Sequence, residues 1–361
     1  MWAIKKTTIM FALILLPSVV SGQGADPARP QSSDDFGRNV SVSQLLANAQ
    51  SSVGRGDQAG AMSALRQAVT LDERHKLARK ALIQLLLLQG ALKEAEEQAQ
   101  TFARLHPEET EAFFIRATVA FQSGRLREAS EWAEACLKRG DRRGEVHKLF
   151  ALSEYLQRRF EGFETHIREA AKLDPLDPDP HYHLGRYYFE DKRYEQALGA
   201  FRKAFELQPE HFKSHYYAGL VHEGRNDIEA AKREMQAAIG VIDRMKVRYA
   251  WPYADLGRLL VNEGDYDRGI GWLYRAVRND PASPYARYNY AKALFRNGAT
   301  FEVKQELMEA IKLDPGYGDA YYLLARYYQR TGESQLAKDT FAKFEEIKKN
   351  PTPSPFGVRR W

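Results

Sequence analysis

The sequence contains a single cysteine, Cys136, among 361 residues. An intramolecular disulfide is therefore impossible, and packing alone must stabilise the chain, even if it is exported. Charge of one sign is also lacking, because 53 Lys and Arg residues against 48 Asp and Glu residues leave a net charge of only +5. This charge is too small to indicate nucleic-acid binding. Hydrophobic residues make up 44% of the chain, which is enough to build a core and excludes a compositionally disordered protein.

Motifs of catalysis and cofactor binding are missing as well. The sequence has no phosphate-binding glycine loop, no nucleophile elbow and no cysteine pair for zinc. His147, His181 and His215 recur every 34 residues. Stacked units would hold them too far apart to share one metal ion, whose ligands lie at about 2 Å, so we assign them to packing. We predict that the chain is not an enzyme and needs no cofactor or metal.

Residues 1–22, MWAIKKTTIMFALILLPSVVSG, have the anatomy of a secretory signal peptide. Lys5 and Lys6 precede a short apolar run, and small residues follow it at 20–22. The run is short for a membrane span, which needs about 20 residues, and Pro17 interrupts it, so we favour cleavage over a retained anchor. The sequence thus predicts an exported protein without a stable membrane span, periplasmic or secreted if it is bacterial.

A repeated pattern dominates the remaining chain. Residues 178–211 contain His181-x2-Leu184-Gly185-x2-Tyr188, then Ala197-x3-Phe201, Ala204 and Pro209. This stretch resembles the tetratricopeptide repeat, a helix–turn–helix unit of 34 residues, with His181 where the family often has Trp. The same positions recur in steps of 34, with one step of 38. The nine resulting repeats are 42–75, 76–109, 110–143, 144–177, 178–211, 212–249, 250–283, 284–317 and 318–351.

Three positions of the repeat, counted from its first residue, support this register. Position 8 is Gly or Ala in eight of the nine repeats, as expected where two helices approach closely. Position 15 is Gly in six repeats and Asn226 in a seventh, which suits the left-handed conformation that ends a helix. Position 32 is Pro in five repeats, which stops the second helix. The resemblance implies an all-α fold, a right-handed solenoid of stacked antiparallel helix pairs over 42–351.

The segments around and inside the array follow from the same register. Residues 23–41, rich in Pro, Ser and Asp, are expected to form a flexible linker, and 352–361 a Pro-rich tail. Four extra residues within 239–249 are close to one helical turn, so we favour a lengthened second helix over a protruding loop. Residues 81–88, ALIQLLLL, predict a helix buried on more than one side, with an apolar partner as the alternative. Cys136 falls at a buried repeat position.

The resemblance also implies where a ligand would bind. In this family the first helices of the repeats line a concave groove, and in the last five repeats their inward positions are rich in Tyr and basic residues. Tyr and Arg are frequent anchors of interfaces, and Arg can hold a carboxylate with two hydrogen bonds. The residues that we assign to the groove are Tyr182, Arg186, Tyr216, Tyr217, Arg258, Tyr288, Asn289, Lys292, Tyr322 and Arg326.

We therefore predict an exported, non-catalytic scaffold that holds an extended, acidic segment of another protein or peptide in this groove. The alternative is a carbohydrate-binding or polymer-export accessory protein of the cell envelope, because an anionic glycan would also suit Tyr and Arg. A third interpretation is that these Tyr side chains only pack and the Arg side chains only face water. The carboxylate clamp of some family members is not transferred, because Asn is absent from the ninth position of every repeat.

Overall fold

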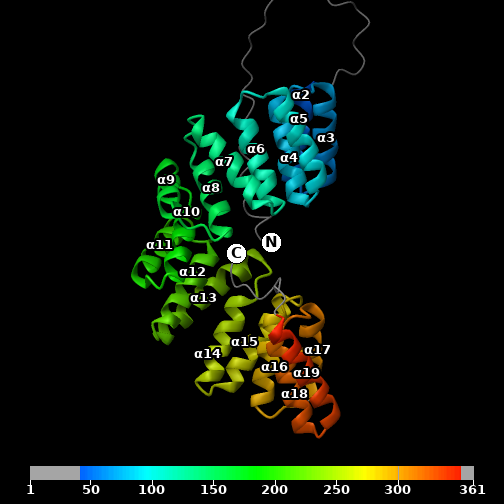
Figure 1. Ribbon diagram of the computed structural model, residues 1–361, viewed down its shortest axis with the longest axis vertical. Helices are drawn as coiled ribbons and strands as arrows, with labels where there is room; N and C mark the ends of the chain where they lie inside the picture. The colour runs from blue at the N-terminus through cyan, green and yellow to red at the C-terminus, as the bar shows by residue number, and fades with distance from the viewer. Residues whose placement is uncertain (1–40, 300, 351–361) are drawn as a thin grey trace, which may run out of the picture. The chain divides into compact units, whose positions relative to one another are not determined.

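The computed structural model describes residues 41–299 and 301–350, and within them the only regular elements are eighteen α-helices (Figure 1). They group into two compact units, one ending at Pro175 and the other beginning at Leu176. This boundary lies two residues before the predicted start of the fifth repeat. The predicted signal peptide and tail, and nearly all of the predicted linker, lie outside the described residues. None of the described helices combines the length and the apolar sequence needed to cross a membrane.

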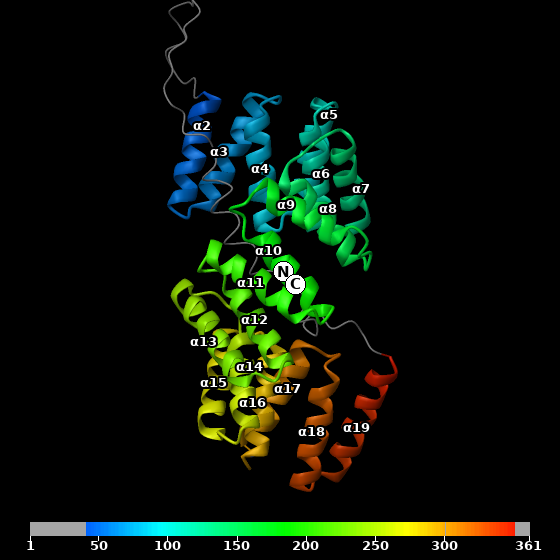
Figure 2. The ribbon, with the colours of Figure 1, turned by 90° about the vertical axis from the view of Figure 1, so that its left-hand side faces the viewer.

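The first unit consists of four helix pairs. Each pair lies within one predicted repeat, and successive pairs stack against each other (Figures 1 and 2). The helices are α2 (Val42–Gly54), α3 (Gln58–Leu71), α4 (Lys76–Gln89), α5 (Leu92–Leu105), α6 (Thr110–Gln122), α7 (Leu126–Lys138), α8 (Gly144–Leu156) and α9 (Phe163–Leu173).

The second unit consists of five helix pairs with the same order of contacts. Its helices are α10 (Asp179–Glu190), α11 (Tyr194–Leu207), α12 (Phe212–Gly224), α13 (Ile228–Met245), α14 (Trp251–Asn262), α15 (Tyr266–Asn279), α16 (Pro284–Arg296), α17 (Phe301–Leu313), α18 (Gly318–Thr331) and α19 (Ser334–Lys349). The prediction of an all-α fold built from antiparallel helix pairs is confirmed.

Small residues at positions 8 and 20 bring the two helices together in most repeats; Ile83, Phe163 and Val303 are the exceptions. Position 8 is buried in all nine repeats, and so is position 20. At Gly257 an added Cβ would lie only 2.7 Å from the backbone oxygen of Gly269 on the facing helix. At Gly185 it would lie 2.5 Å from the ring of Phe201. Packing at this density leaves no room for even one more carbon atom at these two sites.

The turn between the two helices has the same backbone conformation in every repeat. Position 15 has a positive φ, between 57° and 92°, in all nine repeats. Six of these residues are glycine and one is Asn226, as predicted, but the other two are Arg158 and Lys192. The chain therefore adopts the left-handed turn even where the sequence offers no residue that favours it.

Other sequence predictions also agree with the helix ends and their burial. Each helix that precedes a position-32 proline ends two residues before it, as α5 does at Leu105 before Pro107. Helix α13 has 18 residues where its counterparts α11 and α15 have 14, so the extra residues lengthen the second helix. Cys136 is fully buried. Within 81–88 only Gln84 and Leu88 are not fully buried, which confirms deep packing of α4.

A second contact within the repeat joins repeat position 4, on the first helix, to repeat position 23, on the second helix. Its chemistry changes from repeat to repeat. Tyr253 and Trp272 form a ring contact with centroids 6.3 Å apart. Arg287 and Glu306 form an ion pair at 2.7 Å. The contacts at this place in the other repeats include Arg79 with Gln98, Phe113 with Trp132, His147 with His166 and His215 with Glu234.

The close helix approach at Gly257 can be tested with two glycine substitutions in the same repeat. We expect Gly257→Ala to destabilise the protein by about 1–3 kcal/mol, because the new methyl group meets a backbone atom that cannot rotate away. Gly271→Ala in α15 is the control, since no atom lies within 4 Å of its Cβ and the substitution should stabilise by about 0.5–1 kcal/mol. Urea unfolding of both variants measures the difference, and equal effects would contradict this account of the contact.

Candidate functional site

All ten residues predicted to line the groove lie on the first helices of the five repeats in the second unit. We call the solvent-facing surface of these helices, α10, α12, α14, α16 and α18, the first-helix face. Five of the ten residues are buried: Tyr182, Arg186, Tyr216, Tyr217 and Asn289. Arg258 and Tyr288 are partly exposed, and Lys292, Tyr322 and Arg326 are exposed.

Position 5 illustrates why half of the predicted residues are buried. Tyr182 at this position packs against Tyr217 of the following first helix, with ring centroids 5.8 Å apart, and it is 5% exposed. Tyr322 holds the same position in the ninth repeat, beyond which the structure describes no further repeat, and it is 43% exposed. Position 5 therefore lies in the seam between successive repeats. The prediction that Tyr182, Arg186, Tyr216, Tyr217 and Asn289 line a groove is corrected, because all five are buried, Tyr182 and Tyr216 in that seam.

A buried carboxylate links three successive first helices. Asp255 on α14 is fully buried and accepts hydrogen bonds from the hydroxyl groups of Tyr216 on α12 (2.7 Å) and Tyr285 on α16 (2.5 Å). Arg258 pairs with Asp255 at 3.1 Å and with both carboxylate oxygens of Glu223 at 2.8 Å. Burial by itself would lower the pKa of Arg258, but these acidic partners and Tyr285 raise it above its ordinary value. Arg258 therefore stays charged, and its charge is compensated within the protein.

The four extra residues of the sixth repeat supply a further aromatic contact to this network. Tyr249 follows α13, and its ring lies 5.1 Å from that of Phe212 and 5.8 Å from that of Tyr216. Its backbone N–H donates to Asn279 Oδ1 at 2.7 Å, and Asn279 Nδ2 donates to the carbonyl oxygen of Val247 at 3.0 Å. The extra turn thus places a tyrosine beside α12 and fixes the segment that carries it to α15.

A cationic cluster lies at the α10 and α12 end of the face. The guanidinium group of Arg186 lies over the rings of Tyr182 and Tyr217, at 5.7 and 5.1 Å from their centroids. Burial and, to a smaller extent, Arg186 lower the pKa of the Lys213 ammonium group to about 8, against the opposing effect of Asp179. In the described part of the chain Lys213 has no ion pair. Lys213 is thus held in a place that disfavours its own charge.

The exposed basic residues lie on α16 and α18. Lys292 Nζ lies 5.6 Å from the centroid of the Tyr288 ring, and Arg326 donates to the hydroxyl of Tyr322 at 3.3 Å. Neither Lys292 nor Arg326 forms an ion pair among residues 41–299 and 301–350. Burial and the Asp319 carboxylate raise the pKa of Tyr288 to about 12, so this tyrosine stays neutral. Of the four basic residues assigned to the groove, Arg186, Arg258, Lys292 and Arg326, the last two therefore present charge to solvent. Asn289 donates to the Tyr285 carbonyl oxygen of its own helix at 2.9 Å.

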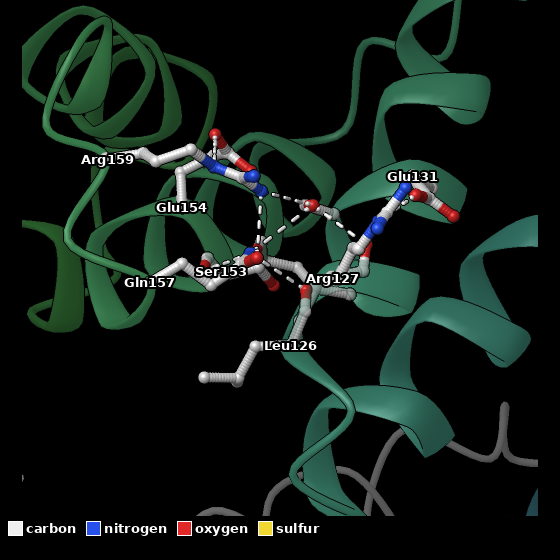
Figure 3. Close-up of polar contacts among 9 residues, drawn as sticks. Leu126, Arg127, Glu131, Ser153, Glu154, Gln157 and Arg159 are labelled. Carbon is white, nitrogen blue, oxygen red and sulfur yellow. Dashed lines mark hydrogen bonds and ion pairs between the residues drawn. The ribbon is translucent and has the colours of Figure 1, made fainter.

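The first unit contains polar networks that serve packing. Figure 3 shows the contact between α7 and α8, where Gln157 Nε2 donates to the carbonyl oxygens of Leu126 (3.1 Å) and Ser153 (3.0 Å). Arg159 forms an ion pair with Glu154 at 2.6 Å beside it. These polar groups satisfy one another's hydrogen-bonding capacity at the seam between the third and fourth repeats. No group of three or more metal-ligating side chains occurs in the described residues of either unit.

The sequence analysis missed the role of three residues in this site. Asp255, Glu223 and Tyr249 were not among the ten residues assigned to the groove. Asp255 and Glu223 compensate the charge of Arg258, and Tyr249 packs against Tyr216. A signal existed for Asp255, since it is the one carboxylate inside 252–261, where most neighbours are apolar. A buried carboxylate needs partners, which points to the Tyr and Arg residues at neighbouring repeat positions.

The perturbed lysine gives a pH-dependent prediction. Because the folded state lowers the pKa of Lys213 to about 8 from the ordinary 10.5, the folded protein disfavours the bound proton. The resulting penalty is fully present below pH 8 and declines as the pH rises towards 10.5. Lys213→Met should therefore raise the free energy of unfolding at pH 7, and this gain should shrink between pH 8 and 10.5. Lys312→Met, at an exposed site, is the control; the same gain for Lys213→Met at every pH would refute the prediction.

Comparison with known proteins identifies the repeat family, and one of the matched stretches, 178–211, coincides with a predicted repeat. Models described as tetratricopeptide repeat match residues 93–143, 178–211, 254–300 and 306–339. The TPR repeat-containing thioredoxin TTL4 of Arabidopsis thaliana is 34% identical over 82 residues, which are 23% of this chain and 12% of that protein. Anaphase-promoting complex subunit 3 of Schizosaccharomyces pombe is 25% identical over 177 residues, 48% of this chain and 26% of that protein. The chain thus matches only a minor part of these relatives.

Among solved structures, the APC/C hetero-tetramer Cut9–Hcn1 contains a chain that superposes with a TM-score of 0.59 at 16% identity. The superposition covers 79% of this chain and 55% of the other, and it supports the fold alone. The helix pairs, the positive φ that position 15 adopts in all nine repeats and the matches to repeat models all indicate the same repeat family. The chain is a tetratricopeptide-repeat protein.

Proposed function

We propose that this protein is a non-catalytic interaction scaffold whose first-helix face binds an extended, acidic segment of a partner protein. The observation that carries this proposal is that basic groups on α12, α16 and α18, among them Lys213, Lys292 and Arg326, lack a carboxylate partner in the described residues. Apart from Lys213, most half-buried cations in the described residues are paired, as Arg258 is with Glu223. An uncompensated cation attracts an anionic ligand, more strongly where it is partly desolvated, as Lys213 is, than where it is exposed, as Lys292 and Arg326 are.

Tyrosines beside these cations fit the same ligand. Tyr288 and Tyr322 lie next to Lys292 and Arg326 and offer flat apolar area with a polar end. Such side chains lose little conformational entropy on binding and are common at interfaces. An extended peptide could place carboxylates on the cations and apolar side chains on the rings. The relatives named as complex subunits are consistent with a scaffold role.

An anionic glycan is the second candidate ligand, in keeping with a cell-envelope accessory protein. Trp251 and Tyr285 form a stacked pair with centroids 4.2 Å apart, and both are partly exposed. Aromatic faces of this kind can also support a sugar ring. A panel of acidic peptides and anionic oligosaccharides, measured on the same protein preparation, separates the two ligand classes.

The charge on the first-helix face provides the direct test. In the double variant Lys292→Glu/Arg326→Glu we expect the affinity for acidic peptides to fall about tenfold or more at low salt, because attraction becomes repulsion. The double variant Arg278→Glu/Lys312→Glu changes the same charge on the second helices α15 and α17 and should bind like the wild type. Fluorescence anisotropy at low and high salt measures both. Unchanged affinity and salt dependence in the first variant would remove this face from the binding site.

Export is a separate proposal that rests on residues 1–22 alone. We propose cleavage after the small residues at 20–22 and a periplasmic or secreted mature protein. The check is N-terminal sequencing of the protein purified from its host. A mature chain that begins near residue 23 would support export, and a chain that retains Lys5 and Lys6 would contradict it.

A further inference from the structure

Two histidines of the first unit face each other at repeat positions 4 and 23. His147 on α8 and His166 on α9 have their Nδ1 atoms 2.9 Å apart and their ring centroids 5.1 Å apart. Phe150 covers one side of His166 with its ring at 4.9 Å. Both histidines remain partly exposed, so solvent and small ions can reach the pair.

This pair differs in chemistry from the polar contacts at the same place in other repeats. Arg287 with Glu306 and His215 with Glu234 each join a cation or proton donor to a carboxylate. In the histidine pair, the two Nδ1 atoms instead face each other with one proton between them. A neutral imidazole ring keeps one nitrogen atom with a free lone pair. Neutral imidazole is the form that binds transition-metal ions.

We propose that His147 and His166 form a two-imidazole binding site for a divalent transition-metal ion of the zinc, nickel and copper class. This site is distinct from the 34-residue histidine ladder excluded above, because its two ligands come from one repeat. It is independent of the proposed partner-binding function. Water or a donor from another molecule fills the remaining coordination positions, since the structure groups no third protein ligand with the pair in the described residues.

The distance between the two nitrogen atoms requires only a small adjustment, and both rings must also turn so that their lone pairs meet at the ion. A tetrahedral ion with metal–nitrogen distances of about 2.0–2.1 Å holds two nitrogen atoms about 3.3 Å apart, so the present 2.9 Å would widen by about 0.4 Å. The proton now shared between the two Nδ1 atoms must leave that place, and the ring that carries it takes up the Nε2–H tautomer. Both Nδ1 lone pairs are then available, and no net proton is released. Imidazole ligands suit Zn²⁺, Ni²⁺ and Cu²⁺.

Two carboxylates near the pair are each compensated by a basic side chain. Asp141 is held by Arg143 at 2.6 Å, and Glu169 lies near Lys172 at 3.4 Å. The two imidazole nitrogen atoms therefore supply the affinity for the ion.

The repeat provides matched variants for the test. His166→Gln removes one ligand and keeps a polar side chain. His181→Gln is the control, because His181 has the same repeat position as His147, and in its repeat Ala200 holds the position of His166. Ala200→His adds the missing partner and should build a second pair. Ni²⁺ and Zn²⁺ titrations by calorimetry, on full-length protein without an affinity tag, give the affinities, and thermal unfolding confirms that each variant folds.

We expect His166→Gln to weaken metal binding about tenfold or more, given that even outer-shell changes cost about 10–100-fold. His181→Gln should leave the affinity unchanged, and Ala200→His should raise the number of bound ions by one. Cu²⁺ bound to the wild type should show two nitrogen ligands by electron paramagnetic resonance. Equal affinity in the wild type and His166→Gln, or a single nitrogen ligand, would overturn the proposal. A change in acid stability alone, without a change in metal affinity, would also overturn it.

Discussion

The close contact between the two helices of each repeat is the constraint on which the rest of the structure depends. With one cysteine there is no internal disulfide, so each helix pair is held by packing. That packing needs the small residues at positions 8 and 20, since a Cβ at Gly257 would meet the backbone oxygen of Gly269 at 2.7 Å. A helix pair of this kind leaves apolar surface uncovered on both sides, so neighbouring repeats must stack to bury it. Stacking in turn creates the seams in which the tyrosines of position 5 lie.

Next to this uniform contact, each repeat has a contact whose chemistry varies. The pair at positions 4 and 23 is aromatic in one repeat, ionic in another and a histidine pair in a third. Several polar members of this contact, such as His147, His215 and Arg287, are partly exposed, which lowers the cost of a polar group. Arg79 is buried and is instead satisfied by hydrogen bonds to Gln98 and to the Glu73 carbonyl. The array therefore combines a constant interior with positions at which each repeat carries its own chemistry.

The sequence could predict the fold because most repeats carry the residue that each conformation prefers. Position 15 shows how far this reasoning extends. Gly90 adopts the left-handed conformation, and the chain then closes with a hydrogen bond from Ala91 N to Leu86 O at 2.9 Å. Lys192 has the same conformation with Arg193 N bonded to Tyr188 O at 2.8 Å, although a left-handed L-residue costs about 1–2 kcal/mol. Packing of the two flanking helices determines the turn there, and no local signal could have predicted it.

The site was less predictable, because exposure and pairing depend on neighbours that a single repeat does not contain. Tyr182 and Tyr322 share one repeat position, but a following repeat buries the first and is not present beyond the second. Arg258 and Lys292 also share a position, and only Arg258 has carboxylates from two first helices beside it.

The charge that a ligand meets on the first-helix face is therefore a property of the stack. Repeat position identifies which side chains can reach the face. The partners supplied by adjacent repeats, such as Asp255 and Glu223, decide which of those side chains remain available for binding. It follows that a basic stripe read from a repeat alignment overstates the positive charge of the surface, because every cation that finds a carboxylate on the next helix contributes to stability instead of to recognition.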